Sequence, residues 1–140
     1  INPDRKGLDF NESVDLDTLL KNSDVISIHS NLETSRHLID LAQIKKMKST
    51  AYLINVSRGG IVQEQDLAEA LSSGLLSGAG IDVTETEPLP PDSPLLQAPN
   101  LILTPHMAWY SEQASSDLKT KTAEEAARFL SGMPLKNKLN

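Results

Sequence analysis

Cysteine is absent from the 140 residues, which excludes a disulfide framework, a thiolate metal site and a cysteine nucleophile. An excess of positive charge is also absent. The formal net charge is −6, so no overall basic field would attract nucleic acid or an anionic membrane. No apolar run approaches the roughly 20 residues that span a bilayer. These absences predict a soluble, cytoplasmic protein without a direct nucleic-acid or membrane partner.

The N-terminal stretch INPDRKGLDF lacks the apolar core of a signal peptide, and the chain lacks a starting methionine. We therefore expect a processed or partial product. The length corresponds to about one domain. With 39% hydrophobic and 23% charged residues, the composition is that of a globular domain able to bury a core.

Four short apolar runs, rich in Ile and Val, recur along the chain. They are Asp24–Ser30, Ala51–Ser57, Gly78–Val83 and Leu101–His106. Such runs are typical of strands buried on both faces of a parallel sheet. Five prolines within Glu85–Asn100 predict a loop that crosses the surface between the last two strands.

Helical patterns precede the first run and separate the first three. The first helix would begin after an N-cap, Asp15 or Asp17, and the second would begin at Asp40. The third would end before Gly74, a plausible C′ residue, and a long helix would follow from about Ser111 to Ser131. Alternation of strands and helices predicts an α/β fold with a parallel sheet and right-handed crossovers.

Ionisable and polar side chains gather where the apolar runs end, at the edge where doubly wound sheets bind their ligands. They are His29, Ser57, Arg58, Asp82, Glu87 and His106. Two interpretations of Arg58 with Gly59 and Gly60 are possible: the glycines simply make a turn, or the cation binds an anionic ligand. A purely structural sheet needs no such cluster at one edge, which favours the ligand.

Three segments then resemble a known family: LINVSRGGIV, GAGIDVTETEP and PNLILTPHMAWYS. In order and spacing they are similar to signatures of the D-isomer-specific 2-hydroxyacid dehydrogenases. That family includes glycerate and phosphoglycerate dehydrogenases, hydroxypyruvate reductases and the C-terminal-binding corepressors. The stretch TPHMAWYSEQAS is especially similar to the corepressor branch and its bacterial relatives. The resemblance covers nearly the whole chain and implies a Rossmann-like doubly wound parallel sheet.

The resemblance implies four roles. Arg58 would bind the carboxylate and carbonyl of a small 2-oxo acid through its planar fork, and His106 would be the general acid–base. Glu87 would hold His106 and favour its charged form, while Asp82 would orient the nicotinamide carboxamide of NAD or NADP. Each residue also has an alternative without a functional role. Arg58 could form a surface ion pair, and His106 could simply end a strand. Glu87 could be a solvated loop acid, and Asp82 could form a turn.

Further residues match places that line the cofactor in the family: Ser30, Val56, Ser57, Arg58, Asp82, His106 and Ala108. Trp109 and Tyr110 would line the substrate pocket or simply pack. His29 is expected to be structural, and His37 is expected to face solvent without a role.

The chain departs from the family in one important respect, because it contains no G-x-G-x-x-G. In the family that loop precedes a strand whose end resembles Ile1–Pro3. Residues 1–140 would therefore be the carboxyl-terminal part of a dinucleotide-binding domain, with 111–140 as terminal helix and tail. The Gly-rich first βαβ unit and the substrate domain would lie upstream. Asn2 stands where an acid would accept the NAD ribose hydroxyls, and Arg5 and Lys6 could meet an NADP phosphate.

Two functions follow from the resemblance. The first is an NAD(P)-dependent oxidoreductase that interconverts a small 2-oxo acid and its D-2-hydroxy acid, inactive as this fragment alone. The alternative is a nucleotide-sensing protein of the corepressor type. Without the upstream strand, Asp24–Ser30 would become an exposed edge, which predicts pairing with a second copy in a homodimer.

Overall fold

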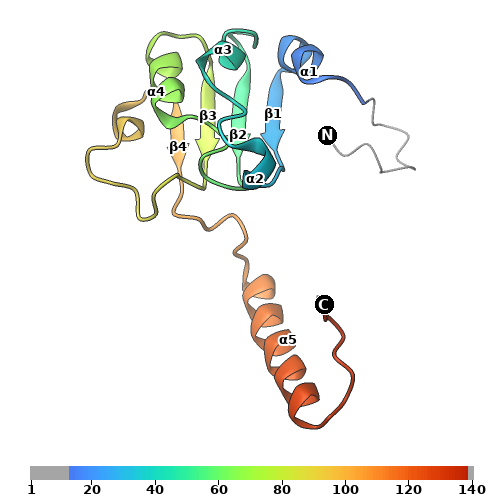
Figure 1. Ribbon diagram of the computed structural model, residues 1–140. Coiled ribbons are helices and arrows are strands. Elements are labelled where there is room, and N and C mark those ends of the chain that lie inside the picture. The colour runs from blue at the N-terminus through green and yellow to red at the C-terminus, as the bar shows by residue number, and fades with distance from the viewer. Residues whose placement is uncertain (1–12, 139–140) are drawn as a thin grey trace. The chain divides into compact units, whose positions relative to one another are not determined.

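The computed structural model describes residues 13–138, which form two compact units that divide after His106. The first unit contains a parallel sheet, and the second contains one long helix (Figure 1). Asn2, Arg5 and Lys6, on which the choice between NAD and NADP depends, lie outside the described residues. No helix within residues 13–138 has the length and apolar character needed to cross a membrane.

The sheet has four strands in the order β1-β2-β3-β4, and every neighbouring pair is parallel. The strands are β1 (Val25–Ile28), β2 (Tyr52–Asn55), β3 (Gly78–Ile81) and β4 (Leu101–Leu103). Each lies within one of the predicted apolar runs, and all four arrows point the same way in Figure 1. The predicted α/β class and parallel sheet are therefore confirmed.

The helix caps follow from side chains at the helix ends. α1 (Leu16–Asn22) is capped by Asp15, whose carboxylate accepts a 2.8 Å hydrogen bond from the Thr18 N–H, so Asp15 rather than Asp17 is the cap. α4 (Glu64–Ser72) is followed by Gly74 with φ +67°, the left-handed conformation that glycine adopts most easily.

Two segments between β1 and β2 differ from the prediction. The helix expected from Asp40 onward is a single turn, α3 (Leu41–Ile44), although Met47 beyond it is still buried. A second one-turn helix, α2 (Leu32–Ser35), is capped by Asn31 and is not among the predicted helices. The carboxylate of Asp66 in α4 accepts a 2.7 Å hydrogen bond from Leu41 N, which ties α3 to α4.

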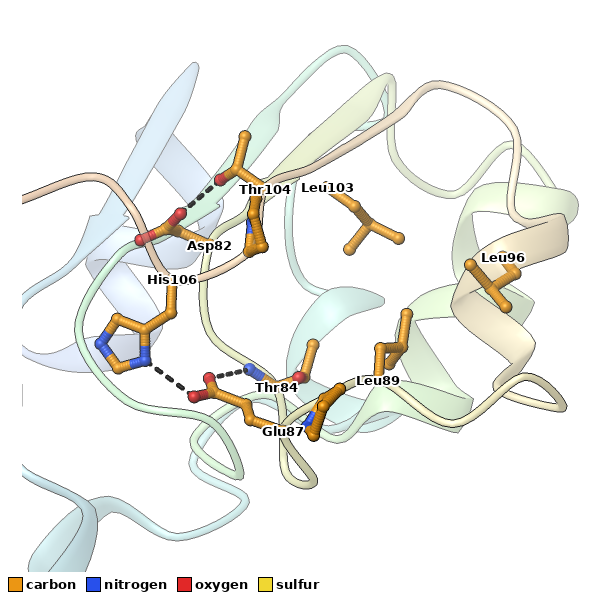
Figure 2. A pocket seen from close by; sticks show the side chains of 10 residues that line it. Asp82, Thr84, Glu87, Leu89, Leu96, Leu103, Thr104 and His106 are labelled. Carbon is orange, nitrogen blue, oxygen red and sulfur yellow. Dashed lines mark hydrogen bonds and ion pairs between the residues drawn. The ribbon is translucent and has the colours of Figure 1, made fainter. Parts of the chain in front are cut away.

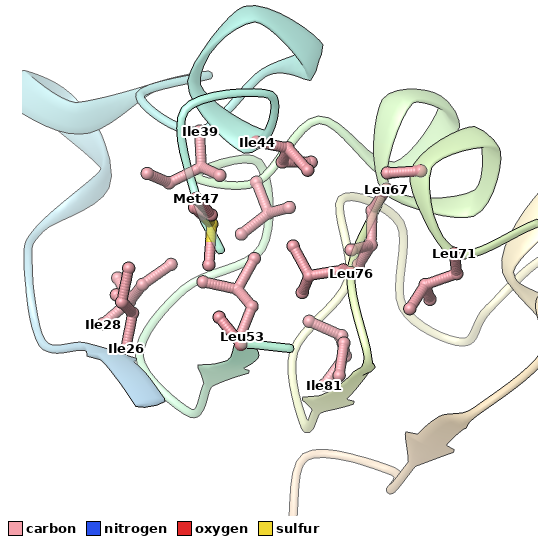
Figure 3. Close-up of a cluster of buried hydrophobic side chains, with 14 of the residues drawn as sticks. Ile26, Ile28, Ile39, Ile44, Met47, Leu53, Leu67, Leu71, Leu76 and Ile81 are labelled. Carbon is pink, nitrogen blue, oxygen red and sulfur yellow. The ribbon is translucent and has the colours of Figure 1, made fainter. Parts of the chain in front are cut away.

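Within residues 13–106, helices cover one face of the sheet and leave the other uncovered. Each strand is next to its predecessor, so right-handed crossovers place every connection on the same face. α1 packs on α3, and α3 packs on α4, over a core that Figure 3 shows. The strand residues that point into this core are Ile26, Ile28, Leu53, Asn55, Ala79 and Ile81.

The prediction that the strands are buried on both faces is wrong for the described residues. β1 alternates exposed and buried positions, with Val25 60% and Ile26 5% exposed, and Ile102 in β4 is 70% exposed. The register places Val25 beside Tyr52, which is also exposed. The physical reason is the monotonic strand order, which provides helices for one face only.

The proline-rich loop also differs from the expectation of a purely surface path. It contains a 3₁₀ helix, η1 (Pro94–Gln97), that packs against α4 and buries Leu95 to 1% exposure. One buried leucine thus anchors this long connection between β3 and β4.

The second unit contains α5 (Glu112–Leu130), close to the predicted bounds. The hydroxyl of Ser111 accepts a 3.0 Å hydrogen bond from Ala114 N, and Gly132 follows the helix with φ +66°. The helix therefore begins and ends close to the residues that the sequence predicts.

One-sided packing predicts unequal effects of truncation on the two faces. Leu53→Ala empties a fully buried position and should lower the free energy of unfolding by about 2–5 kcal/mol. Ile102→Ala, on the open face, should change it by less than about 0.5 kcal/mol. Urea denaturation of the two variants compares them, and equal losses would mean that the open face is covered in solution.

Candidate active site

The turn after β2 is built by a polar side chain inside an apolar strand. Asn55 is 1% exposed, and its Oδ1 accepts hydrogen bonds from Ser57 N at 3.2 Å and from Ser57 Oγ at 3.0 Å. Its Nδ2 donates to the carbonyl of Arg58 at 2.9 Å. Because a buried amide needs such partners, Asn55 fixes the backbone that presents Ser57 and Arg58.

Arg58 is exposed beyond the end of β2. Its Nη1 donates to the Ser57 carbonyl at 2.6 Å. Among residues 13–138, no carboxylate forms an ion pair with it. The alternative of an ordinary surface ion pair therefore finds no partner in this part of the chain.

The two glycines after Arg58 have different structural reasons. A Cβ on Gly59 would lie 1.9 Å from the carbonyl oxygen of Thr84, so a side chain there would collide with backbone. Gly60 has φ +75°, which disfavours any side chain. The double glycine makes a turn and also lets the loop after β3 approach the turn after β2 directly.

His106 and Glu87 form the contact that the sequence predicts. His106 Nδ1 lies 2.8 Å from Glu87 Oε2, and Glu87 Oε1 accepts a 3.1 Å hydrogen bond from Thr84 N. The bond from His106, followed by that from Thr84 N, holds the pKa of Glu87 below its usual range. Figure 2 shows the pair, which joins the loop after β3 to the residues after β4.

The backbone of His106 is unusual, because its φ of +52° lies in the left-handed region. Its N–H donates to the carbonyl of Asp82 at 2.8 Å, which holds this conformation. Asp82 is 4% exposed, and its carboxylate accepts a hydrogen bond from the hydroxyl of Thr104. The three residues thereby connect the ends of β3 and β4.

A pocket of about 450 Å³ lies beside this pair. Figure 2 shows His106 and Glu87 on one side of it and three leucines on the other. It is lined by Asp82, Thr84, Glu87, Pro88, Leu89, Leu96, Leu103, Thr104, Pro105 and His106. An imidazole–carboxylate pair at the rim of an apolar pocket can move a proton to or from a bound molecule.

Arg58 lines a second depression of about 560 Å³, together with Ser30 and Ser57. The hydroxyl oxygen of Ser30 is buried and has no hydrogen-bond partner within residues 13–138. Arg58 and His106 thus lie at the same carboxyl edge of the sheet but line different depressions. The predicted pair of Glu87 and His106 is present, while the expected role of Arg58 in binding the substrate stays a prediction.

The remaining predicted residues divide between the two units. Val56 is 39% exposed at the end of β2, and the His29 ring bonds to Ser27 Oγ at 2.8 Å, which fits the structural role expected for His29. Ala108 belongs to the second unit. So do Trp109 and Tyr110, whose rings meet edge to face at 5.7 Å between centroids.

Sequence reasoning missed several residues around the loop after β3. His37, to which the sequence assigns no role, lies with its Nε2 3.1 Å from Glu85 Oε1. Glu64 Oε1 accepts a 2.6 Å hydrogen bond from Glu85 N. These contacts join residues 48 and 21 positions apart, so no local spacing in the sequence signals them.

The depressed pKa of Glu87 gives a test of the pair in solution. His106→Ala should raise the pKa of Glu87 toward about 4.3, the ordinary value for glutamate, because the strongest stabiliser of the carboxylate is removed. A carboxyl ¹³C NMR titration measures it, and His29→Ala is the control that leaves it unchanged.

The sign of the stability effect follows from the same shift. A folded pKa below the unfolded value stabilises the fold above the unfolded pKa, and this stabilisation is lost as the pH falls through the folded pKa. If Glu87 titrates identically with and without the His106 ring, the contact is not formed in solution.

Comparison with known proteins agrees with this geometry. The family model for the NAD binding domain of D-isomer specific 2-hydroxyacid dehydrogenases matches residues 2–108. A glyoxylate reductase of Thermofilum pendens is 47% identical over 120 residues, which are 85% of this chain and 34% of that protein. A glycerate dehydrogenase of Methylorubrum extorquens is 44% identical over 125 residues, 86% of this chain and 40% of that protein.

A solved structure gives the same result for the fold. The D-isomer specific 2-hydroxyacid dehydrogenase from Lactobacillus delbrueckii ssp. bulgaricus, in its NAD-complexed form, superposes with a TM-score of 0.78 at 31% identity. The match covers 88% of this chain and 42% of that one, and the chain spans less than half the length of the curated relatives it matches. The Rossmann-type α/β fold, the order of the motifs and the extent of the match lead to one conclusion: the chain belongs to the D-isomer specific 2-hydroxyacid dehydrogenase family.

Proposed function

We propose that the full-length protein containing this sequence is an NAD(P)-dependent oxidoreductase that interconverts a small 2-oxo acid and its D-2-hydroxy acid. The observation that best supports it is the 2.8 Å contact between His106 and Glu87 at the carboxyl edge of a parallel sheet. General acid–base chemistry needs a titrating group held in one orientation, and this pair supplies it.

The residues present fit a nicotinamide cofactor. Asp82 offers a buried carboxylate at the end of β3. Ser30, whose buried hydroxyl has no hydrogen-bond partner among residues 13–138, lines the depression that Arg58 also lines. Val56 and Ser57, at the end of β2, would complete the lining within this unit, and the cofactor-binding role of Ala108 stays a prediction. When bound, the cofactor supplies or accepts the hydride. NAD and NADP are both compatible with the described residues.

His106 would exchange a proton with the substrate oxygen. With Nδ1 donating to Glu87, Nε2 is the ring atom that would give its proton to the carbonyl oxygen during reduction. The Glu87 carboxylate would hold the ring in this orientation. In the reverse direction the neutral ring would accept the hydroxyl proton, so the same pair serves both reactions.

Arg58 would hold the carboxylate of the substrate. Its guanidinium has no acidic partner among the described residues, and its fork matches a planar carboxylate. The Ser57 carbonyl and the buried Asn55 amide fix the turn on which it stands. The substrate would therefore carry an anionic group at one end and a polarised carbon at the position that is reduced or oxidised.

Kinetics of the full-length protein test this assignment. His106→Ala should lower kcat about 100- to 10,000-fold and leave the cofactor Kd nearly unchanged, because proton transfer matters in the transition state. Arg58→Lys should also lower kcat/KM strongly, since a point charge cannot reproduce the guanidinium fork. Cofactor oxidation with a panel of 2-oxo acids measures both, and near-normal turnover in both variants would favour the nucleotide-sensing alternative.

We infer that the isolated chain assembles as a homodimer. β1 pairs only with β2 within the described residues, which leaves one side of its backbone unpaired, and Val25 on it is 60% exposed. An apolar strand edge of this kind favours pairing with a second copy about a two-fold axis. A cytoplasmic location stays a prediction.

Dilution tests this assembly. The isolated chain should self-associate, and Val25→Lys should weaken the association because a charge at the edge opposes strand pairing. Ile102→Lys, at the far side of the sheet, should not. Light scattering across a dilution series measures the mass. A wild-type chain that stays monomeric at high concentration would show that β1 is not an available edge.

A further inference from the structure

The loop that presents Glu87, residues 84–87, is shaped by hydrogen bonds within the loop itself. Inside the loop, Thr84 N donates to Glu87 at 3.1 Å and Thr84 Oγ1 donates to the Thr86 carbonyl at 2.9 Å. These bonds shape the loop but do not determine its distance from His106. Bonds to other elements must do that.

Glu64, the first residue of α4, supplies such a bond. Its Oε1 accepts a 2.6 Å hydrogen bond from the backbone N–H of Glu85, two residues before Glu87. α4 does not need this carboxylate as its cap, because the cap is Gln63, which accepts from Asp66 N at 2.8 Å. The reach of Glu64 across to the loop is thus separate from the start of its own helix.

The surroundings of Glu64 make its charged form less favourable than it is in water. Partial burial, followed by the nearby negative charge of Glu85, raises the pKa of Glu64, while the bond from Glu85 N opposes the rise. On the other side of the loop, His37 contacts the Glu85 side chain at 3.1 Å. Gly59 lies against the Thr84 carbonyl, so the loop cannot move closer to the turn after β2.

We propose that Glu64 is a positioning residue for the Glu87–His106 pair. Glu64 holds the backbone at Glu85, the short loop transmits this position to Glu87, and Glu87 orients the imidazole of His106. The significance for catalysis rests on the proposed function, but the position of Glu87 can be measured without any turnover.

Two substitutions separate the reach of the side chain from its charge. Glu64→Asp keeps the negative charge and a favourable first residue for α4, but withdraws the carboxylate by one methylene from Glu85 N. Glu64→Gln removes the charge and keeps a carbonyl oxygen at the same reach. Glu69→Asp, an exposed carboxylate on the same helix, is the matched control.

Two readouts on the full-length protein test the proposal. The first is the pKa of Glu87 by carboxyl ¹³C NMR, and the second is kcat and KM with a 2-oxo acid. Glu64→Asp should raise the pKa of Glu87 and lower kcat on the order of 10-fold with little change in KM, because the reacting groups are misplaced rather than lost. Glu64→Gln and Glu69→Asp should change neither.

The results that would contradict the role of Glu64 can be told apart from those that would contradict the proposed function. If Glu64→Asp lowers stability but leaves the Glu87 pKa and kcat unchanged, Glu64 is only a structural brace and the proposal is wrong. If Glu64→Gln has the larger effect, charge rather than contact is responsible, which also overturns it. If no 2-oxo acid is turned over at all, the proposed function fails, and the Glu87 pKa in the three variants still decides the role of Glu64.

Discussion

Parallel pairing of four consecutive strands is the constraint on which the rest of the structure depends. It brings the carboxyl ends of β2, β3 and β4 to one edge, so that Arg58, Asp82 and His106 lie on successive strand ends. It also places every helix of this unit on one face, since each crossover has the same sense. Polar side chains at one edge of the sheet and a face that residues 13–106 leave uncovered therefore have a single origin.

Much of this arrangement could be predicted from the sequence, because it depends on local patterns. Short Ile- and Val-rich runs gave the strands, and Asp15, Gly74 and Ser111 gave helix ends through bonds within a few residues. The Glu87–His106 contact could be predicted because motif resemblance supplied it. The roles of Arg58 and Asp82 toward substrate and cofactor stay predictions.

Other features could not be predicted, because they depend on distances between segments. Burial of a strand face depends on which helices are available to cover it. The residue types at Val25 and Ile102 do not indicate whether a helix covers them. Glu64 and His37 both contact Glu85, and these contacts form only when three segments distant in the sequence come together. In the sequence, Asn55 is a polar residue within an apolar run. Only the structure shows that its side chain bonds to the backbone of Ser57 and Arg58 and so fixes the turn after β2.

The left-handed backbone of His106 has a consequence for how this position can evolve. A residue other than glycine in that conformation costs on the order of 1 kcal/mol, so the fold itself would prefer a different residue there. If His106 transfers the proton as proposed, selection for stability and selection for proton transfer would act in opposite directions at this position. A protein that did not need proton transfer at this position could replace His106 with glycine or asparagine and keep the same backbone, because both residues adopt the left-handed conformation readily.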